Sequence, residues 1–305
     1  MSSSISSTSV PAIPPRPRPE PATHQEGSTM HEFPVPGPAQ LSIEFGAGDI
    51  TLEACDTDRV TVDLRGDDDS ADALAAEAAV EQRGDQVVVA VPRRTGFLRR
   101  TPRLRLRVTL PTGSRVDVRS ESADLDATGR LGDVQVKAGS GDSRIESAND
   151  VTVHSGSGAV SIGTVDGSAT LAAGSGDVTV RAIAGPGRVS TGSGDIRVER
   201  ADGPLQANSG SGDVQLDTAA GDVNANTASG DQSVNRVARG RVKLNSASGD
   251  IHVGVVDGTP VWVDVHTVSG SIDSALSDGE PPVEGEEAVE MRVHTVSGDI
   301  SLARA

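Results

Sequence analysis

Aspartate recurs in the phrase Ser-Gly-Asp. Its carboxylate is the group in this sequence whose type and regular spacing could serve the same chemical role at every repeat. Carboxylate oxygens at repeated Gly-rich turns are the ligands that Ca²⁺ takes in the β-rolls of repeat toxins. The sequence therefore offers a column of candidate metal ligands, namely Asp142, Asp177, Asp195, Asp213, Asp231 and Asp250, with Asp299 at its end.

A structural corner is the competing interpretation of the same phrase. In an Asx or Ser turn the Ser and Asp side chains accept backbone N–H groups, and Gly supplies a positive φ. Carboxylates stacked one per coil would repel by about 3 to 4 kcal/mol at an effective dielectric of about 20, so they need water, hydrogen bonds or a cation. A calcium roll also needs Asp in both halves of the period, and "GPLQANS" lacks it. We predict the corner and keep calcium as the alternative.

A basic stretch, "PRRTGFLRRTPRLRLR", interrupts an otherwise acidic chain. It predicts contact with an anionic membrane surface or an acidic partner, with an apolar anchor at the loop tip. The competing interpretation is a solvated hairpin whose charges offset the acidic rod. The candidate contact residues are Arg93, Arg94, Phe97, Leu98, Arg99 and Arg100.

Other reactive side chains favour no chemistry. His266 and His294 lie in matching "VHTVSG" phrases, but two histidines are too few for a metal site. The many serines include no nucleophile elbow with an identified base, and no nucleotide-binding βαβ unit accompanies the glycines. The acidic stretch 277–290 is expected to be a solvated loop. We therefore predict no enzyme, no catalytic residue and no cofactor.

The phrase itself marks a repeat. Copies start at residues 122, 140, 157, 175, 193, 211, 229, 248, 269 and 297, so the intervals are 18, 17, 18, 18, 18, 18, 19, 21 and 28. Counting Ser as one, positions four and six are apolar, and so are thirteen and fifteen. Each period thus predicts two short strands that bury their apolar faces only by stacking on the next period. The fold class is all-β: a parallel β-helix or β-solenoid of about ten 18-residue coils.

The residues ahead of the repeat predict a small β-rich N-terminal cap. "LSIEFGAGDITLEA", "RVTVDL", "QVVVAV" and "RLRLRVTL" are strand-like, and "SADALAAEAAVEQ" predicts one short helix. The first residues are rich in Ser and Pro, which is typical of a disordered arm. We divide the chain into an arm (1–37), a cap (38–120) and a solenoid (121–305).

These phrases also carry a resemblance. "LSIEFGAGDITLEACDTDRVTVDLRG", "LRVTLPTGSRVDVRS" and the run of "GSGDVxV" units resemble a bacterial β-strand-repeat family of unknown function, catalogued as "putative adhesin". The resemblance covers about residues 38–305. It implies a β-helical or roll-like solenoid, and it carries over no catalytic residue.

Composition narrows the function. The chain has three Phe, one Trp and no Tyr, and its net charge is −17. Stacking platforms for sugars or single-stranded nucleic acid normally use aromatic faces, and nucleic acid demands a basic surface, so we expect no nucleic-acid partner. No export signal and no run of 18 apolar residues is found, and Cys55 stands alone. The expected location is the cytoplasm, with the cell surface by a non-standard route as the alternative.

The leading hypothesis is a non-catalytic solenoid that acts as a scaffold or interaction module for an unidentified protein partner. The alternatives are a calcium-binding β-roll or surface adhesin, and a β-helix enzyme acting on a polysaccharide. The last coil is expected to finish at Ala305 with "SGDISLARA" and no cap. An open strand edge there predicts end-to-end self-association.

Overall fold

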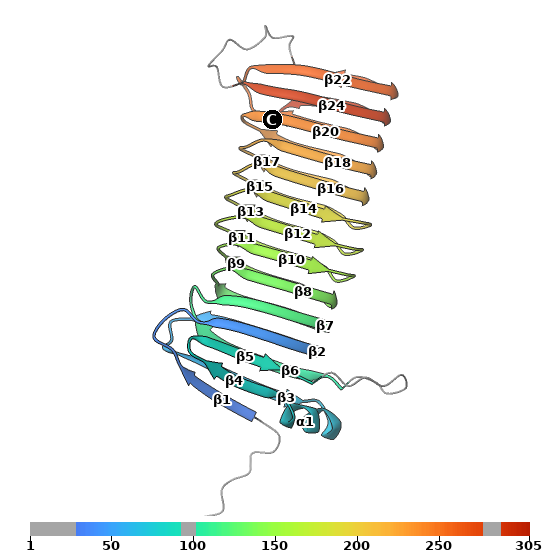
Figure 1. Cartoon of the computed structure of the whole chain (residues 1–305). Coiled ribbons are helices and arrows are strands. Elements are labelled where there is room, and N and C mark those ends of the chain that lie inside the picture. Colours follow the sequence, from blue (N-terminus) through green and yellow to red (C-terminus); the bar gives the residue numbers. More distant parts are fainter. Residues whose placement is uncertain (1–28, 93–101, 277–287) are drawn as a thin grey trace, which may run out of the picture.

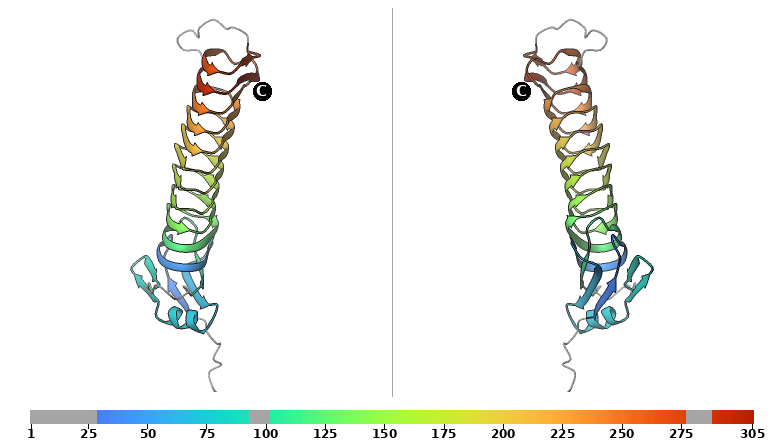
Figure 2. Two further views of the ribbon diagram at one scale, coloured as in Figure 1. Left: turned by 90° about the vertical axis from the view of Figure 1, so that its right-hand side faces the viewer. Right: turned by 90° about the vertical axis from the view of Figure 1, so that its left-hand side faces the viewer.

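The chain forms a rod of stacked coils, seen from the side in Figure 1 and along its two narrow edges in Figure 2. The computed structural model describes residues 29–92, 102–276 and 288–305. Each coil contributes one strand to each of two parallel ladders. Ladder 1 contains, in rod order, β8 (Val134–Ser140), β10 (Val151–Ser155), β12 (Ala169–Ala173), β14 (Gly187–Thr191), β16 (Leu205–Ser211), β18 (Val223–Ser229), β20 (Gly240–Ser248), β24 (Val289–Ser297) and β22 (Val261–Ser269).

Ladder 2 forms the opposite face of the rod. It contains β9 (Ser143–Ala148), β11 (Val160–Val165), β13 (Val178–Ile183), β15 (Ile196–Ala201), β17 (Val214–Ala219), β19 (Gln232–Val237), β21 (Ile251–Val255), β25 (Ile300–Arg304) and β23 (Ile272–Ser274). The predicted all-β solenoid is confirmed, with one coil for each copy of the repeat.

The core between the ladders is aliphatic. Val178 and Val180, the predicted apolar positions four and six, are fully buried, as is Val189 at position fifteen of the same sequence period. Like residues stack on like residues, because parallel strands in register place equivalent positions about 4.8 Å apart. A core this narrow is filled by Val, Ile, Leu and Ala.

Two long strands extend the coil geometry back into the predicted cap. β7 (Arg115–Arg130) pairs first with β8 and then with β9, so it makes a complete coil by itself. β2 (Gln40–Cys55) lies parallel to β7 on one side, and to β5 (Gln86–Ala90) and β6 (Leu104–Pro111) on the other. The predicted boundary between residues 120 and 121 was therefore wrong: it falls inside β7, and the stack of coils begins earlier.

Antiparallel strands end the stack at its N-terminal side. β3 (Arg59–Gly66) pairs with β6 and with β1 (Thr29–Pro34), and β4 (Ala79–Arg83) pairs with β5. The predicted arm was too long, because residues 29–34 form β1, in which Phe33 packs against the core.

The predicted helix was also too long. α1 (Asp69–Ala76) begins at the N-cap Asp68, whose carboxylate accepts the N–H of Ala71, and the chain then turns into β4. The sequence "AVEQR" of β4 is strand because it completes a hairpin with β5.

The C-terminal coil does not end the rod. β24 lies between β20 and β22, and β25 lies between β21 and β23, so the last coil in sequence is the second-last in space (Figure 1). The expectation that an open end follows Ala305 was therefore wrong. The outermost described coil is β22–β23, where Val263 is 38% and Ile272 is 49% exposed.

Two serines distinguish the outermost β22–β23 coil. The Asp299 carboxylate Oδ1 accepts the N–H of Ser271 at 2.7 Å and its hydroxyl at 3.0 Å. Ser271 stands where most other coils have Asp, so it has no carboxylate to offer a further coil, as is also true of Ala159 inside the stack. Ser274 stands opposite the buried Leu302, at an inward position that is apolar in β25. Both features suit a coil that is covered on one side only.

The coil order predicts which engineered disulfides form. In a Cys55→Ser background, Lys243→Cys with Arg292→Cys should close a bridge on mild oxidation, because these residues are direct partners on β20 and β24. Lys243→Cys with Asp264→Cys should not, because β24 separates the two. Mass spectrometry of non-reduced peptides measures both variants. A bridge from residue 243 to residue 264 would mean that the coils stack in sequence order.

Candidate functional site

The predicted metal ligands form a column along one edge of the rod, at the corner between ladder 1 and ladder 2. In each case the carboxylate is bound to the next coil. The Asp195 Oδ1 accepts the backbone N–H of Asp213 at 2.9 Å, and the Asp213 Oδ1 accepts that of Asp231 at 2.8 Å. The same bond joins Asp124 to Asp142, Asp142 to Ala159, Asp177 to Asp195, Asp231 to Asp250, and Asp250 to Asp299.

Hydroxyl groups satisfy the remaining corner atoms. Thr191 donates to the carbonyl oxygen of Gly176 at 3.1 Å and accepts the N–H of Gly194 at 3.1 Å. Ser209 donates to Gly194 in the same way. The corner is therefore a hydrogen-bonded joint between coils, unlike the local turn that the sequence suggested.

Glycine is required at this joint mainly because backbone packs on backbone. A Cβ on Gly212 would lie 2.1 Å from the carbonyl oxygen of Gly194, closer than any real contact. Gly230 additionally has a φ of +146°, as the turn hypothesis expected.

The column of corner carboxylates has few free oxygen atoms with which to bind a cation. One carboxylate oxygen of each bonded Asp already accepts an N–H group, and within residues 29–92, 102–276 and 288–305 no three His, Cys, Asp or Glu side chains come together as a metal site.

A second corner uses the same bond, from ladder 2 back to ladder 1. The Asp150 Oδ1 accepts the N–H of Ser168 at 2.6 Å, and the Asp222 Oδ1 accepts that of Arg241 at 2.9 Å. These backbone hydrogen bonds lower the pKa of Asp150 and of Asp222, and the bond from Ser271 lowers the pKa of Asp299.

The structure describes only some of the other residues that the sequence analysis singled out. The basic tip, Arg93 to Arg100, lies outside the described residues, as does most of the acidic stretch 277–290. Of the adjoining arginines, Arg105 pairs with Asp67 at 3.1 Å and Arg103 lies 3.8 Å from Asp49. His266 and His294 lie side by side on the neighbouring strands β22 and β24, with their ring centres 6.3 Å apart and their ring planes tilted by 54°.

The feature that sequence reasoning missed is the outer surface of ladder 1, here called the polar face. Two rows of its outward side chains, followed from β8 to β22, are rich in amides, hydroxyls and cations, and among the described residues of these two rows Asp264 is the only carboxylate. One row is Gln135, Thr152, Thr170, Arg188, Gln206, Asn224, Lys243, Arg292 and Asp264; the other is Lys137, His154, Ala172, Ser190, Asn208, Asn226, Asn245, His294 and His266. A further outward row includes Glu290 on β24.

Ladder 2 differs sharply from this face. Its outward rows mix both signs of charge, as where Arg197 donates to Gln215 at 2.8 Å and lies 3.5 Å from the Asp217 carboxylate. Charge on that face is largely paired within the face itself. The contrast between the two ladders becomes visible only when residues one period apart are read as neighbours.

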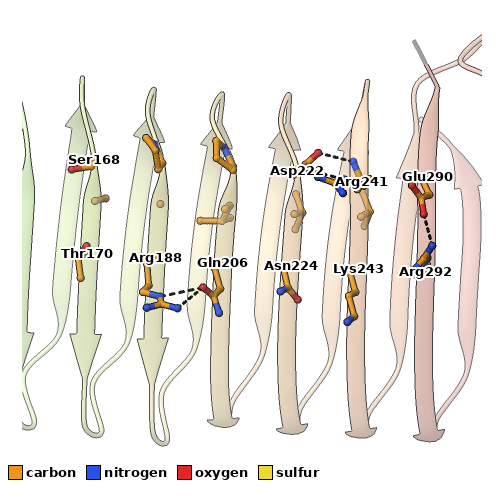
Figure 3. Close-up of a pocket in the computed structure, with 17 residues that line it drawn as sticks. Ser168, Thr170, Arg188, Gln206, Asp222, Asn224, Arg241, Lys243, Glu290 and Arg292 are labelled. Atoms are coloured by element: carbon orange, nitrogen blue, oxygen red, sulfur yellow. Dashed lines mark hydrogen bonds and ion pairs between the residues drawn. The ribbon is translucent and has the colours of Figure 1, made fainter. Parts of the chain in front are cut away.

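A groove of about 760 Å³ lies on the polar face and crosses β12, β14, β16, β18, β20 and β24 (Figure 3). Arg188, Arg241, Lys243 and Arg292 line it, together with two carboxylates, Asp222 and Glu290. The groove thus carries a net charge of +2 in a chain of net charge −17.

The carboxylates of the groove are neutralised by their neighbours. Asp222 binds the Arg241 guanidinium at 2.8 Å, and Glu290 binds that of Arg292 at 2.8 Å. Arg188 instead donates two hydrogen bonds, of 2.7 and 3.1 Å, to the neutral Gln206 carbonyl. Within the described part of the chain, neither Arg188 nor Lys243 has an acidic partner, so their charge remains available.

Fold and surface together define a two-faced β-solenoid with one polar face. The chain belongs to the Toastrack DUF4097 family, whose profile matches residues 39–236 and 203–303. This confirms the resemblance inferred from the repeats. The comparison with curated proteins finds no match. No helix in the described residues is long and apolar enough to cross a membrane.

Several solved structures are similar in outline. A protein described as a "putative adhesin" from Bacteroides fragilis has 11% identity and a TM-score of 0.42, over 92% of this chain and 98% of that chain. A "putative lipid binding protein" from Parabacteroides distasonis has 13% identity and a TM-score of 0.45, over 91% and 97%. A "putative adhesin" from Parabacteroides merdae has 10% identity and a TM-score of 0.43, over 91% and 97%. Similarity at this level carries no argument about what this chain binds.

The close packing at the corner predicts that one added methyl group there strongly lowers the stability of the fold. Gly212→Ala should lower the free energy of unfolding by more than about 2 kcal/mol, because the new Cβ forces the Gly194 carbonyl away and opens the joint. Gly46→Ala is the matched control, since nothing lies within 4 Å of its Cβ position. Urea unfolding of both variants measures the difference, and similar losses would refute the close contact.

Three corner carboxylates, Asp150, Asp222 and Asp299, predict acid sensitivity. Their lowered pKa means that folding gains stability above the unfolded Asp pKa of about 3.9 and loses it as the pH falls through the folded pKa. Replacing Asp150, Asp222 and Asp299 together by Asn keeps an acceptor oxygen but removes the titration. Thermal unfolding between pH 7 and about pH 2 should therefore show a flatter acid limb for the triple variant. An unchanged acid limb would show that these carboxylates do not set it.

Proposed function

We propose that the chain is a non-catalytic binding module that holds an extended partner against its polar face. The observation that carries the proposal is the segregation of charge: two long rows nearly free of carboxylates lie on one face of a chain with 44 Asp and Glu. Unpaired cations and amides arranged on a rigid ladder can bind a partner without first reordering, which reduces the entropic cost of association.

The acids of the groove support binding rather than catalysis. General acid catalysis near neutral pH needs a carboxyl group whose pKa is raised, usually by burial. The pKa of Asp222 is lowered by its hydrogen bonds to Arg241, and Glu290 is tied to Arg292. These carboxylates orient arginines, and an oriented arginine is a recognition element.

Site-specific photo-crosslinking in the native cell tests the proposal. Thr170 and Thr179 belong to the same coil and are both exposed, but Thr170 lies on the polar face and Thr179 on ladder 2. A photoreactive residue at position 170 should give adducts of reproducible mass, because the polar face is where the partner lies.

The residue at position 179 is the matched control and should give few adducts. Equal adducts from both positions, or none from position 170, would contradict the proposal. Turnover of a substrate by the purified protein would likewise replace it with an enzymatic function.

A further inference from the structure

We propose that the groove binds a linear acidic glycan, in which carboxylated sugar units are separated by neutral ones, lying along the rod axis. This inference rests on the proposed function, because it names the ligand class of the same face.

The groove is long and shallow in the direction that crosses the strands. It passes over six neighbouring strands of ladder 1, which at about 4.8 Å per strand corresponds to about 24 Å. A ligand that fills it must be linear and extended. A hexose unit in an extended chain advances by about one strand spacing, so successive units can meet equivalent positions of successive coils.

The order of side chains along the groove is cation, amide, amide, cation. Arg188, Gln206, Asn224 and Lys243 are direct neighbours on β14, β16, β18 and β20. Two available cations are therefore separated by two amides (Figure 3). Cations bind carboxylates, and amides both donate to and accept from sugar hydroxyls.

Other extended polyanions match this order less well. A polyphosphate carries charge on every unit and has no hydroxyl groups for Gln206 and Asn224. An acidic peptide would gain most by adding a strand at a free sheet edge, whereas the strands under the groove are paired on both sides. A nucleic acid carries a phosphate on every unit, whereas only two of the four positions from Arg188 to Lys243 are cationic.

A tryptophan near one end of the groove can report ligand binding through its fluorescence. Trp262 on β22 lies with its ring centre 5.7 Å from the Arg292 guanidinium, which lines the groove. It is the only tryptophan, and the chain has no tyrosine. A ligand carboxylate that draws Arg292 away should change the tryptophan fluorescence.

The experiment is a titration of the full chain with defined oligomers at physiological salt. A hyaluronan hexasaccharide is the acidic glycan. Its uronates are two units apart, and the long, flexible side chains of Arg188 and Lys243, which start three strands apart, can lean toward two of them. Chitohexaose is the neutral glycan of similar length, and a short polyphosphate of equal charge is the polyanion without sugars. Tryptophan fluorescence and calorimetry report binding, and we expect the hyaluronan oligomer to bind at least about tenfold more tightly than either comparison ligand.

Two charge-matched double variants locate the site. Arg188→Gln with Lys243→Gln should weaken the hyaluronan affinity by about tenfold or more, because both available cations are lost. Arg144→Gln with Arg197→Gln removes the same charge from ladder 2, where each arginine has an acidic neighbour. This control should bind within about twofold of the native chain.

Several results would overturn the proposal. They are a preference for chitohexaose or polyphosphate, an equal loss in both double variants, or no binding of the hyaluronan oligomer. Adducts from position 170 but not 179, found alongside any of these results, would leave the polar face as a binding face with a different ligand. Failure of the glycan assignment is thereby distinguished from failure of the proposed function.

Discussion

The hydrogen bond from a corner carboxylate to the backbone N–H of the next coil is the constraint on which the rod depends. It fixes the rise and register between coils, because Asp195 can reach the amide of Asp213 only when the two corners are stacked. Glycine at the same corner lets the backbones approach, and a buried hydroxyl such as Thr191 satisfies the freed carbonyl. With the corner fixed, alternation along each strand decides which side chains enter the core and which face outward.

The end of the stack differs from the coil beneath it. The β24–β25 coil has Asp299 at the corner and the buried Leu302 in its inner row. The β22–β23 coil has Ser271 and Ser274 instead, a combination that suits the outermost place. Inside the stack the ladders can hold a coil without the corner carboxylate, as where Ala159 precedes β11. At the other end, β2 lies inside the stack and antiparallel strands close it. The outer edge of β22 pairs with no further described strand.

Periodicity predicted what each period repeats: the coil, the inward residues and the corner. It could not order the last two coils, because "VWVDVHTVSG" and "VEMRVHTVSG" have the same pattern, and only single residues such as Ser271 separate them. It could not place the boundary within β7, because one long strand belongs to both ladders. It missed the groove, because Arg188 and Lys243 become close only through the register of β14 to β20.

The net negative charge of the chain also has a structural origin. For this reason the net charge does not by itself predict the charge of the partner. Many of the acids sit at corners, where each carboxylate caps a backbone amide, and others pair with arginines on ladder 2. At physiological ionic strength charges act over about 8 Å, so a ligand on the polar face meets Arg188 and Lys243 more strongly than the distant corner column. An acidic chain can therefore present a surface that attracts anions. Because the corners require their aspartates for stacking, the charge that selects a partner must be assessed face by face.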